Sequence, residues 1–135
     1  MSNRVYQGDF KADTNDVAWT ELEPLRKTRG LHITFKMKDN VYVAGGFDNE
    51  FEGLSTCEQF NLLECKWVNC KHSLPYALNS ASVVVSADET FAVITGGITG
   101  EQFSSRVIIF TEDTGFELMA THLLNKRAGH LSMLL

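Results

Sequence analysis

The sequence predicts an all-β protein that is built from a repeat of about 50 residues. Two Gly-Gly pairs, Gly45-Gly46 and Gly96-Gly97, lie 51 residues apart, and each closes an apolar strand-like run, at residues 41–44 and 91–95. No segment shows a long apolar period of 3.6 residues, so the repeating unit is expected to consist of strands. Repeats of this kind pack unit against unit, and the repeat therefore decides the architecture.

Aromatic residues recur at matching places after each Gly pair. Phe60 and Trp67 follow the first pair by 15 and 22 residues, and Phe110 and Phe116 follow the second by 14 and 20. Large rings at such places fill the wedge between neighbouring sheets, while glycine permits positive φ and close backbone approach. The structural residues predicted from the repeat are Gly45, Gly46, Trp67, Gly96 and Gly97.

A third marker precedes the first strand of each unit. Arg29-Gly30-Leu31-His32 and Arg127-Ala128-Gly129-His130 lie 98 residues apart, which is twice 49. The copy expected midway between the two falls at residues 77–80, where both the arginine and the histidine are missing. In that copy alanine replaces the arginine. Trp19 and Trp67 stand ten residues before Arg29 and Ala77.

These features together resemble the kelch repeat. Residues 45–48 (Gly-Gly-Phe-Asp), with 54–60 and Trp67, are similar in particular to repeats of the BTB-kelch family. The resemblance covers residues 15–135 and implies a β-propeller of four-stranded blades. Phe60 and Phe110 stand where kelch repeats usually have tyrosine, and Phe116 or Glu117 stands in place of a tryptophan. The second blade is therefore expected to be a degenerate copy.

The first full blade is expected at residues 29–76. Residues 31–37 alternate apolar and polar side chains, which is the period of a half-buried strand. The short polar turn at residues 38–40 joins this strand to residues 41–44 in a hairpin. Residues 56–61 and 66–70 supply the two outer strands.

The second blade, at residues 77–126, repeats this plan with strands at 81–86, 91–95, 106–110 and 116–121. Residues 1–28 hold an outer half-blade, with strands near Val5-Tyr6 and at residues 19–22, and residues 127–135 begin one strand of a further blade. The predicted fold is an incomplete kelch-type β-propeller with two full four-stranded blades and a partial blade at each end. Closed propellers contain about four to eight blades, so we expect a fragment of a longer propeller, one part of an assembly, or a degenerate product.

Composition argues against several classes of function. The net charge of −5 disfavours a protein that binds nucleic-acid phosphates through a basic surface. No run of 18 apolar residues is present, and no apolar signal segment follows Met1. A cytoplasmic location is therefore expected, with no nucleic acid and no membrane as partner.

Cysteine usage agrees with that location. The three cysteines, Cys57, Cys65 and Cys70, are an odd number and do not form a closed disulfide framework. Reduced thiols are expected. The alternative is a local disulfide between Cys65 and Cys70, on either side of Trp67, in an oxidising compartment.

Motifs for catalysis or metal binding are not found. The densest group of metal-ligating residue types is Cys65, Cys70 and His72, and no second pair follows at zinc-finger spacing. No serine lies in a Gly-x-Ser-x-Gly turn, and the Gly pairs lack the Lys-Ser of a phosphate loop. The sequence predicts no catalytic residue, no cofactor and no metal.

Three loops, at residues 47–54, 71–80 and 98–105, are expected to form a recognition surface. The kelch resemblance places partner binding in loops of this kind. The first loop interleaves aromatic and acidic side chains, a combination that favours a protein hot spot with a basic partner. The predicted partner-binding residues are Phe47, Asp48, Glu50, Phe51, Glu52, His72, Tyr76, Gln102 and Phe103.

The predicted function is that of a non-catalytic interaction module that binds a protein or peptide partner. BTB-kelch relatives imply substrate-adaptor or actin-associated roles. Two alternatives stay open: a kelch-propeller-type enzyme with an oxidase or isomerase-like activity, and a truncated remnant without a function of its own. Self-association, or association with other propeller blades, is a further expectation.

Overall fold

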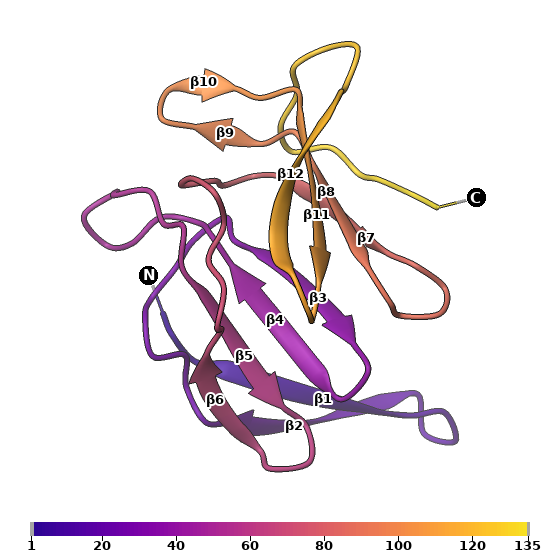
Figure 1. Ribbon diagram of the computed structural model, residues 1–135. Helices are drawn as coiled ribbons and strands as arrows, with labels where there is room; N and C mark the ends of the chain where they lie inside the picture. Colours follow the sequence, from indigo (N-terminus) through magenta and orange to yellow (C-terminus); the bar gives the residue numbers. More distant parts are fainter. Residues whose placement is uncertain (1, 135) are drawn as a thin grey trace.

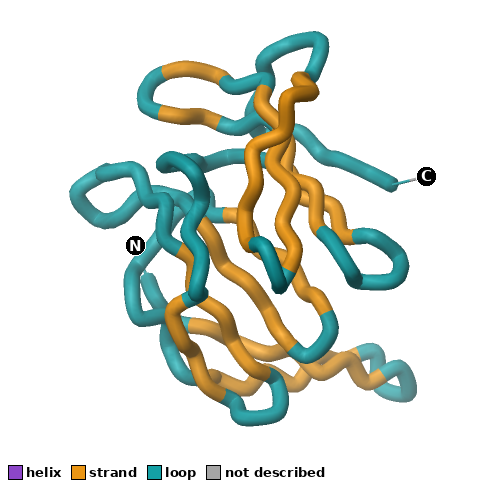
Figure 2. The backbone as a smooth tube through the Cα atoms, in the orientation of Figure 1, coloured by secondary structure: helices purple, strands orange, loops and turns teal. Residues whose placement is uncertain are grey.

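Strands make up the regular structure of the computed structural model, which describes residues 2–134 (Figures 1 and 2). They form two four-stranded sheets and two separate two-stranded sheets, and no helix occurs among the described residues. The all-β fold is therefore confirmed. Met1 and Leu135, the outermost residues of the predicted terminal blades, lie outside the described residues. Within residues 2–134, no helix is long and apolar enough to cross a membrane.

The first four-stranded sheet is a meander in which each strand pairs antiparallel with the next along the chain. Along its first strand, Ile33, Phe35 and Met37 are buried and the two residues between them are exposed, as the period of two predicts. In order across the sheet, the strands are β3 (Ile33–Met37), β4 (Asn40–Ala44), β5 (Cys57–Asn61) and β6 (Lys66–Asn69).

The second four-stranded sheet repeats this plan. Its register shifts once, between Arg106 and Ile108. All eight strands of the two sheets lie within two residues of their predicted bounds. In order across the second sheet, they are β7 (Ser82–Val85), β8 (Ala92–Thr95), β11 (Arg106–Thr111) and β12 (Gly115–His122).

Two hairpins complete the chain. The strands β1 (Val5–Lys11) and β2 (Asp16–Leu22) pair along their full length and are longer than the half-blade that the sequence predicted. The short strands β9 (Ile98–Thr99) and β10 (Gln102–Phe103) pair within a segment that was expected to be a loop. A two-residue strand is too short to give an alternating pattern that sequence reasoning can detect.

The two four-stranded sheets pack against each other through one apolar core. Phe35 and Tyr42 of the first sheet meet Phe110 of the second, with ring centroids 5.3 and 4.8 Å from that of Phe110. Aromatic pairs at such distances add to the free energy of burial. On the opposite face of the first sheet, a smaller cluster that includes Phe60 and Trp67 lies under the β1–β2 hairpin.

Backbone geometry sets the repeat at 49 residues. Leu31, Ser80 and Gly129 each have a positive φ, of 51°, 54° and 62°. The Ser80 amide donates to the Leu31 carbonyl (2.9 Å), just as the Gly129 amide donates to the Ser80 carbonyl (2.8 Å). This register makes Leu78, and not Ala77, the counterpart of Arg29.

The predicted alignment at Ala77 was therefore wrong by one residue. The equal spacing from Trp19 and Trp67 supported it, but these two tryptophans differ in their environments. Trp67 is buried, with 4% of its surface exposed, whereas Trp19 is 69% exposed on the β1–β2 hairpin. Tryptophans that do not occupy equivalent places give no reliable register.

The strand expected at residues 130–135 is absent from its described part. Residues 130–134 form no strand, and Figure 1 shows them (yellow) as an irregular segment that leads past β7 to the end of the chain. A strand needs a neighbour for its backbone hydrogen bonds, and none of the four sheets pairs with this segment.

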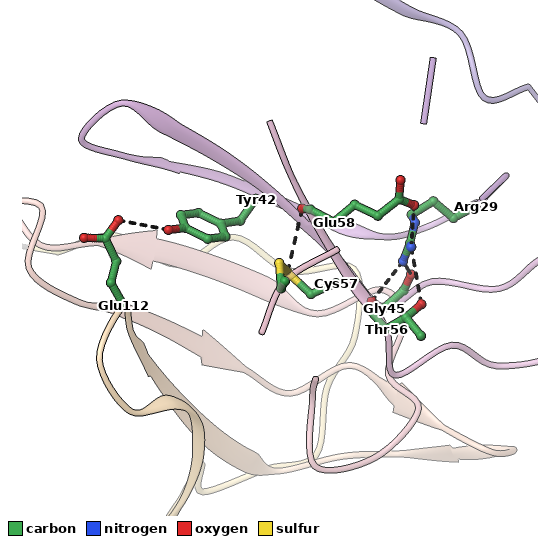
Figure 3. The surroundings of a disulfide bond; sticks show 8 residues. Arg29, Tyr42, Gly45, Thr56, Cys57, Glu58 and Glu112 are labelled. Carbon is green, nitrogen blue, oxygen red and sulfur yellow. Dashed lines mark hydrogen bonds and ion pairs between the residues drawn. A yellow bond between two sulfur atoms is a disulfide. The ribbon is translucent and has the colours of Figure 1, made fainter. Parts of the chain in front are cut away.

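Cys57 and Cys70 form a disulfide between β5 and the residue after β6 (Figure 3). Their Cα atoms are 5.2 Å apart, and the Cys70 amide donates to the Cys57 carbonyl at 2.9 Å. Cys65 is exposed and free. The expectation of reduced thiols and the Cys65–Cys70 alternative are both wrong, because the pairing of β5 with β6 places Cys70 opposite Cys57. Disulfides persist in oxidising compartments, so this bond runs against the cytoplasmic expectation.

Candidate functional site

Three loops meet around an open cavity at one edge of the two sheets. The cavity has a volume of about 340 Å³. Figure 1 shows the β9–β10 hairpin, toward the top, beside the loops that precede β5 and β7, and residues of these segments line the cavity. Its lining comes from all three predicted loops and consists of Phe47, Phe51, Glu52, Gly53, Ala77, Asn79, Gly100 and Glu101.

The loop at residues 47–54 is closed by its own backbone. Phe47 exchanges backbone hydrogen bonds with Gly30, at 2.8 and 3.0 Å, and the Phe51 amide donates to the Asp48 carbonyl at 3.1 Å. Phe51 has a φ of 63°, which turns the chain back toward the sheet. The rings of Phe47 and Phe51 consequently stack with centroids 5.7 Å apart, and Phe51 is 79% exposed.

The Asp48 carboxylate organises this loop from within through hydrogen bonds from the loop backbone. Its Oδ1 accepts the amides of Glu50 and Glu52, at 3.1 and 3.0 Å, and its Oδ2 lies 3.5 Å from Lys27 Nζ. Loss of solvation raises the pKa of Asp48, but the hydrogen bonds from the Glu52 and Glu50 amides and from Lys27 outweigh it and hold the pKa below its ordinary value. Glu50 and Glu52 themselves are exposed.

The opposite wall of the cavity is formed by residues 77–79 and the β9–β10 hairpin. Asn79 and Ile98 exchange backbone hydrogen bonds at 3.0 and 2.8 Å, which fixes the hairpin beside this segment. The first loop comes close to this wall at Gly53, because a Cβ added to Gly53 would lie 3.0 Å from Ala77 Cβ. Glu101, in the turn of the hairpin, is exposed and lines the cavity together with Glu52.

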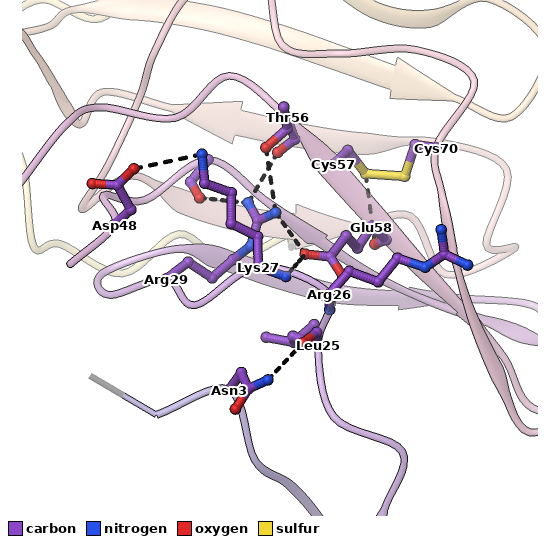
Figure 4. A network of polar contacts seen from close by, with 11 residues as sticks. Asn3, Leu25, Arg26, Lys27, Arg29, Asp48, Thr56, Cys57, Glu58 and Cys70 are labelled. Carbon is purple, nitrogen blue, oxygen red and sulfur yellow. Dashed lines mark hydrogen bonds and ion pairs between the residues drawn. A yellow bond between two sulfur atoms is a disulfide. The ribbon is translucent and has the colours of Figure 1, made fainter. Parts of the chain in front are cut away.

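A buried ion pair ties the two ends of the 47–54 loop together (Figure 4). Arg29 Nη1 donates to the carbonyls of Gly45 (2.8 Å) and Thr56 (3.0 Å), which flank the loop. Arg29 Nη2 lies 2.8 Å from Glu58 Oε1, and the two side chains are 1% and 2% exposed. The Arg26 amide donates to the other Glu58 oxygen at 2.7 Å. One guanidinium thus positions both stems of the loop.

The remaining predicted binding residues lie elsewhere. Gln102 and Phe103 are on the β9–β10 hairpin but line a separate hollow with Arg106 and His122. His72 packs against Gly115 of the second sheet. Tyr76 is partly buried and packs against the main core. The structure therefore brings Phe47, Phe51 and Glu52 together at the cavity, with Asp48 and Glu50 in the same loop.

Tyr42 and Glu112 link the two sheets through a polar contact away from the cavity (Figure 3). The Tyr42 hydroxyl donates to Glu112 Oε1 at 2.9 Å. Burial and this hydrogen bond raise the pKa of Tyr42 well above its ordinary value, whereas the Lys38 ammonium, 2.8 Å from Glu112 Oε2, lowers the pKa of Glu112. The adjoining cavity measures about 50 Å³, far below the roughly 300 Å³ at which ligand sites begin.

No group of three or more His, Cys, Asp or Glu side chains within residues 2–134 is arranged to hold a metal ion. The chemistry that the cavity offers is therefore that of its aromatic rings, its carboxylates and its exposed loop backbone.

Sequence reasoning missed five lining residues, which are Gly53, Ala77, Asn79, Gly100 and Glu101. All five lie in loops that were already assigned to the recognition surface. Glu101 lies in the turn between β9 and β10, whose strands are too short for the sequence pattern to reveal the hairpin.

The fold and the cavity define an all-β repeat protein with a loop-lined cavity at one edge. No family model matches the chain. The chain is similar to the solved structure of YjhT, with a TM-score of 0.78 and 17% sequence identity over 95% of this chain. The match covers 48% of the YjhT chain, so this chain spans about half of that length. At this identity the likeness shows a shared fold alone.

Proposed function

We propose that this chain is a non-catalytic, kelch-type partial propeller that binds a protein or peptide partner in the cavity between the three loops. Two four-stranded meanders at a 49-residue register, packed with β3 beside β7, support the propeller arrangement. The single observation that carries the binding proposal is the convergence of loops from both sheets on one cavity. That cavity presents an exposed aromatic ring and two carboxylates.

The lining favours a partner segment with a basic side chain next to an apolar one. Phe51 offers a ring face, which attracts an arginine or lysine head group as well as apolar surface. Glu52 and Glu101 come from different loops and both line the cavity, so they add attraction for a cation. A volume of about 340 Å³ is in the range of sites that take a few side chains.

A random peptide library displayed on phage tests the proposal. Selection on the immobilised 135-residue chain is expected to enrich peptides with Arg or Lys beside an apolar residue. Phe51→Ser and Glu101→Gln are each expected to weaken the best peptide by about tenfold or more in calorimetric titration, the size typical of a contact worth above 1 kcal/mol. Both residues are exposed, so neither change should unfold the chain.

Phe103→Ser is the matched control. Phe103 is an equally apolar residue of the β9–β10 hairpin, 59% exposed, and it lies outside the cavity. Its substitution is expected to leave the affinity within about twofold. An equal loss in the Phe103 and Phe51 variants, or no loss in the Phe51 variant, would reject the cavity as the binding site.

A further inference from the structure

We propose that two copies of this chain join reciprocally, with residues 130–134 of each copy bound in an apolar cavity of the other. This cavity is distinct from the loop cavity described above, and the proposal does not depend on peptide binding. It rests on the repeat register, on the exposure of the segment and on the backbone groups at the two ends of the repeat.

The receiving cavity lies between the β1–β2 hairpin and the first four-stranded sheet. It has a volume of about 530 Å³, larger than the loop cavity. Its sheet wall is the face of the first sheet that points away from the second sheet, and this wall includes Thr34, Val41, Val43 and Phe60. An apolar cavity of this size at a sheet face favours occupation by apolar side chains.

The equivalent face of the second sheet shows which side chains cover a wall of this kind. On the second sheet, Val83 stands 49 residues after Thr34, and Ala92 and Ile94 stand 51 residues after Val41 and Val43, the same interval as the Gly pairs. These three residues of the second sheet lie in the same apolar core as Ile33 and Phe35 of β3, and β3 and β7 are in contact.

The C-terminal segment presents the counterparts of those two side chains. Leu131 and Met133 stand 98 residues, or two repeats, after Ile33 and Phe35. They are 97% and 79% exposed. Between them, Ser132 turns the other way and its hydroxyl lies 2.9 Å from Thr95 Oγ1. Residues 130–133 therefore alternate, with Leu131 and Met133 toward solvent and His130 and Ser132 against Thr95 of β8.

Backbone hydrogen-bonding groups at the two ends of the repeat are also complementary. Within the chain, the Ser80 amide donates to Leu31, and the Gly129 amide donates to Ser80. At the two ends of this ladder, the Leu31 amide and the Gly129 carbonyl take part in no backbone hydrogen bond within residues 2–134. Docking of a second copy in register lets the Leu31 amide of one copy donate to the Gly129 carbonyl of the other, which repeats the step seen twice within the chain.

Each copy carries one segment and one cavity, so a head-to-tail contact closes as a dimer when the two copies are related by a two-fold axis. If the segment of the first copy fills the cavity of the second, a two-fold axis permits the second to fill the cavity of the first, and the assembly closes as a dimer. The expected particle has twice the chain mass of 15.1 kDa. A closed dimer also removes the exposed apolar face of the segment from water.

Sedimentation equilibrium of the 135-residue chain tests this arrangement. The chain is expected to show a concentration-dependent monomer–dimer equilibrium. Leu131→Asp places a carboxylate in the apolar cavity and is expected to raise the dissociation constant by more than about tenfold. Leu124→Asp is the control, because Leu124 is also fully exposed but lies outside both cavities, and it is expected to leave the equilibrium unchanged. A chain that stays monomeric at every concentration, or a Leu131→Asp variant that dimerises as the wild type does, overturns the proposal.

Cross-linking identifies the contact itself, in a Cys65→Ser background that keeps the Cys57–Cys70 bond. Leu131→Cys and Thr34→Cys are made in separate chains and mixed under mild oxidation. A disulfide-linked dimer is expected from the mixture, and a mixture of Leu124→Cys with Thr34→Cys is expected to give none. A dimer that forms without this cross-link uses another surface and contradicts the proposal.

Discussion

Leu78 occupies in the second repeat the place that Arg29 occupies in the first, and the two residues aligned with the Arg29–Glu58 ion pair are both apolar in the second repeat. The 49-residue register aligns Leu78 with Arg29. Glu58 pairs with Val43 in the first sheet, and Ile108 pairs with Ile94 in the second. Because Ile94 is the counterpart of Val43, Ile108 aligns with Glu58. Counted over the whole residue, Arg29 and Glu58 are 3% and 2% exposed, and Leu78 and Ile108 are each 1% exposed. The same buried positions thus hold charged side chains in the first repeat and apolar side chains in the second.

A double-mutant cycle at Arg29 and Glu58 tests this equivalence. Arg29→Leu alone leaves the Glu58 carboxylate buried without its guanidinium, and is expected to lower the free energy of unfolding by about 3–5 kcal/mol. Arg29→Leu with Glu58→Ile copies the second sheet and is expected to regain part of that loss. Recovery is incomplete because the Arg26 amide loses its acceptor. Urea unfolding gives the four free energies; a double variant that is less stable than both single variants contradicts the equivalence.

Glu112 is expected to make the contact between the two sheets sensitive to acid. The Lys38 ammonium is the main cause of its lowered pKa, and the hydroxyl of Tyr42 and the amide of Asn40 add to the effect. Because the folded pKa lies below the ordinary value of 4.5, Glu112 stabilises the fold above that pH. This contribution is lost as the pH falls through the folded pKa.

The stability difference between wild type and Glu112→Gln measures this contribution. It is expected to be largest near pH 7 and to shrink steadily below about pH 4.5. Glu64→Gln, in the exposed turn between β5 and β6, serves as the control and should show a small difference at both ends of the range. A difference for Glu112→Gln that does not vary with pH would argue against a charged contact.

The Cys57–Cys70 bond is expected to contribute about 3 kcal/mol to the free energy of unfolding. The two residues are separated by 13 positions, and closing a loop of this length in the unfolded chain costs roughly that amount on the chain-entropy account. Cys70→Ser should therefore lower the midpoint of urea unfolding, and Cys65→Ser, at an exposed thiol, should not. Recovery of Cys57 and Cys70 as alkylated free thiols from unreduced protein would show that the bond is absent.

Gly45 is expected to tolerate alanine far less well than Gly100, although both have a positive φ, of 67° and 60°. At Gly100 an added Cβ meets no atom within 4 Å, so only the backbone cost of about 1–2 kcal/mol applies. At Gly45 the Cβ would collide with the carbonyl oxygen of Leu78, at the junction of the two sheets. Thermal unfolding of the two alanine variants should show the larger loss for Gly45→Ala, and equal losses would contradict this reading of the junction.

Strands of the two large sheets could be predicted because their signals are local. The alternation of Ile33, Phe35 and Met37 and the Gly pairs that end β4 and β8 are visible in short windows. The partner of Cys57 could not be predicted, because it depends on how β5 pairs with β6. The Arg29–Glu58 ion pair was missed for the same reason, since it joins residues 29 positions apart that meet only in the folded sheet.

The candidate site was predictable at the level of loops and not of side chains. The sequence placed three loops on one surface, and residues from all three line the cavity. Which side chains turn inward depends on tertiary packing. His72 and Tyr76 have side chains of the type found in binding sites, yet His72 packs on Gly115 and Tyr76 packs on the core. The short β9–β10 pairing directs Phe103 away from the cavity that Glu101 lines.

Mapping of a bound peptide by heteronuclear NMR tests the central claim most directly. A peptide enriched by the library selection is titrated into the isotopically labelled chain at a concentration where the monomer predominates. Amide shifts are expected to concentrate in residues 47–53, 77–79 and 98–101, around the stacked rings of Phe47 and Phe51. Shifts that instead cluster at the β1–β2 hairpin and Val43, or that spread evenly over both sheets, would contradict a recognition surface built from the three loops.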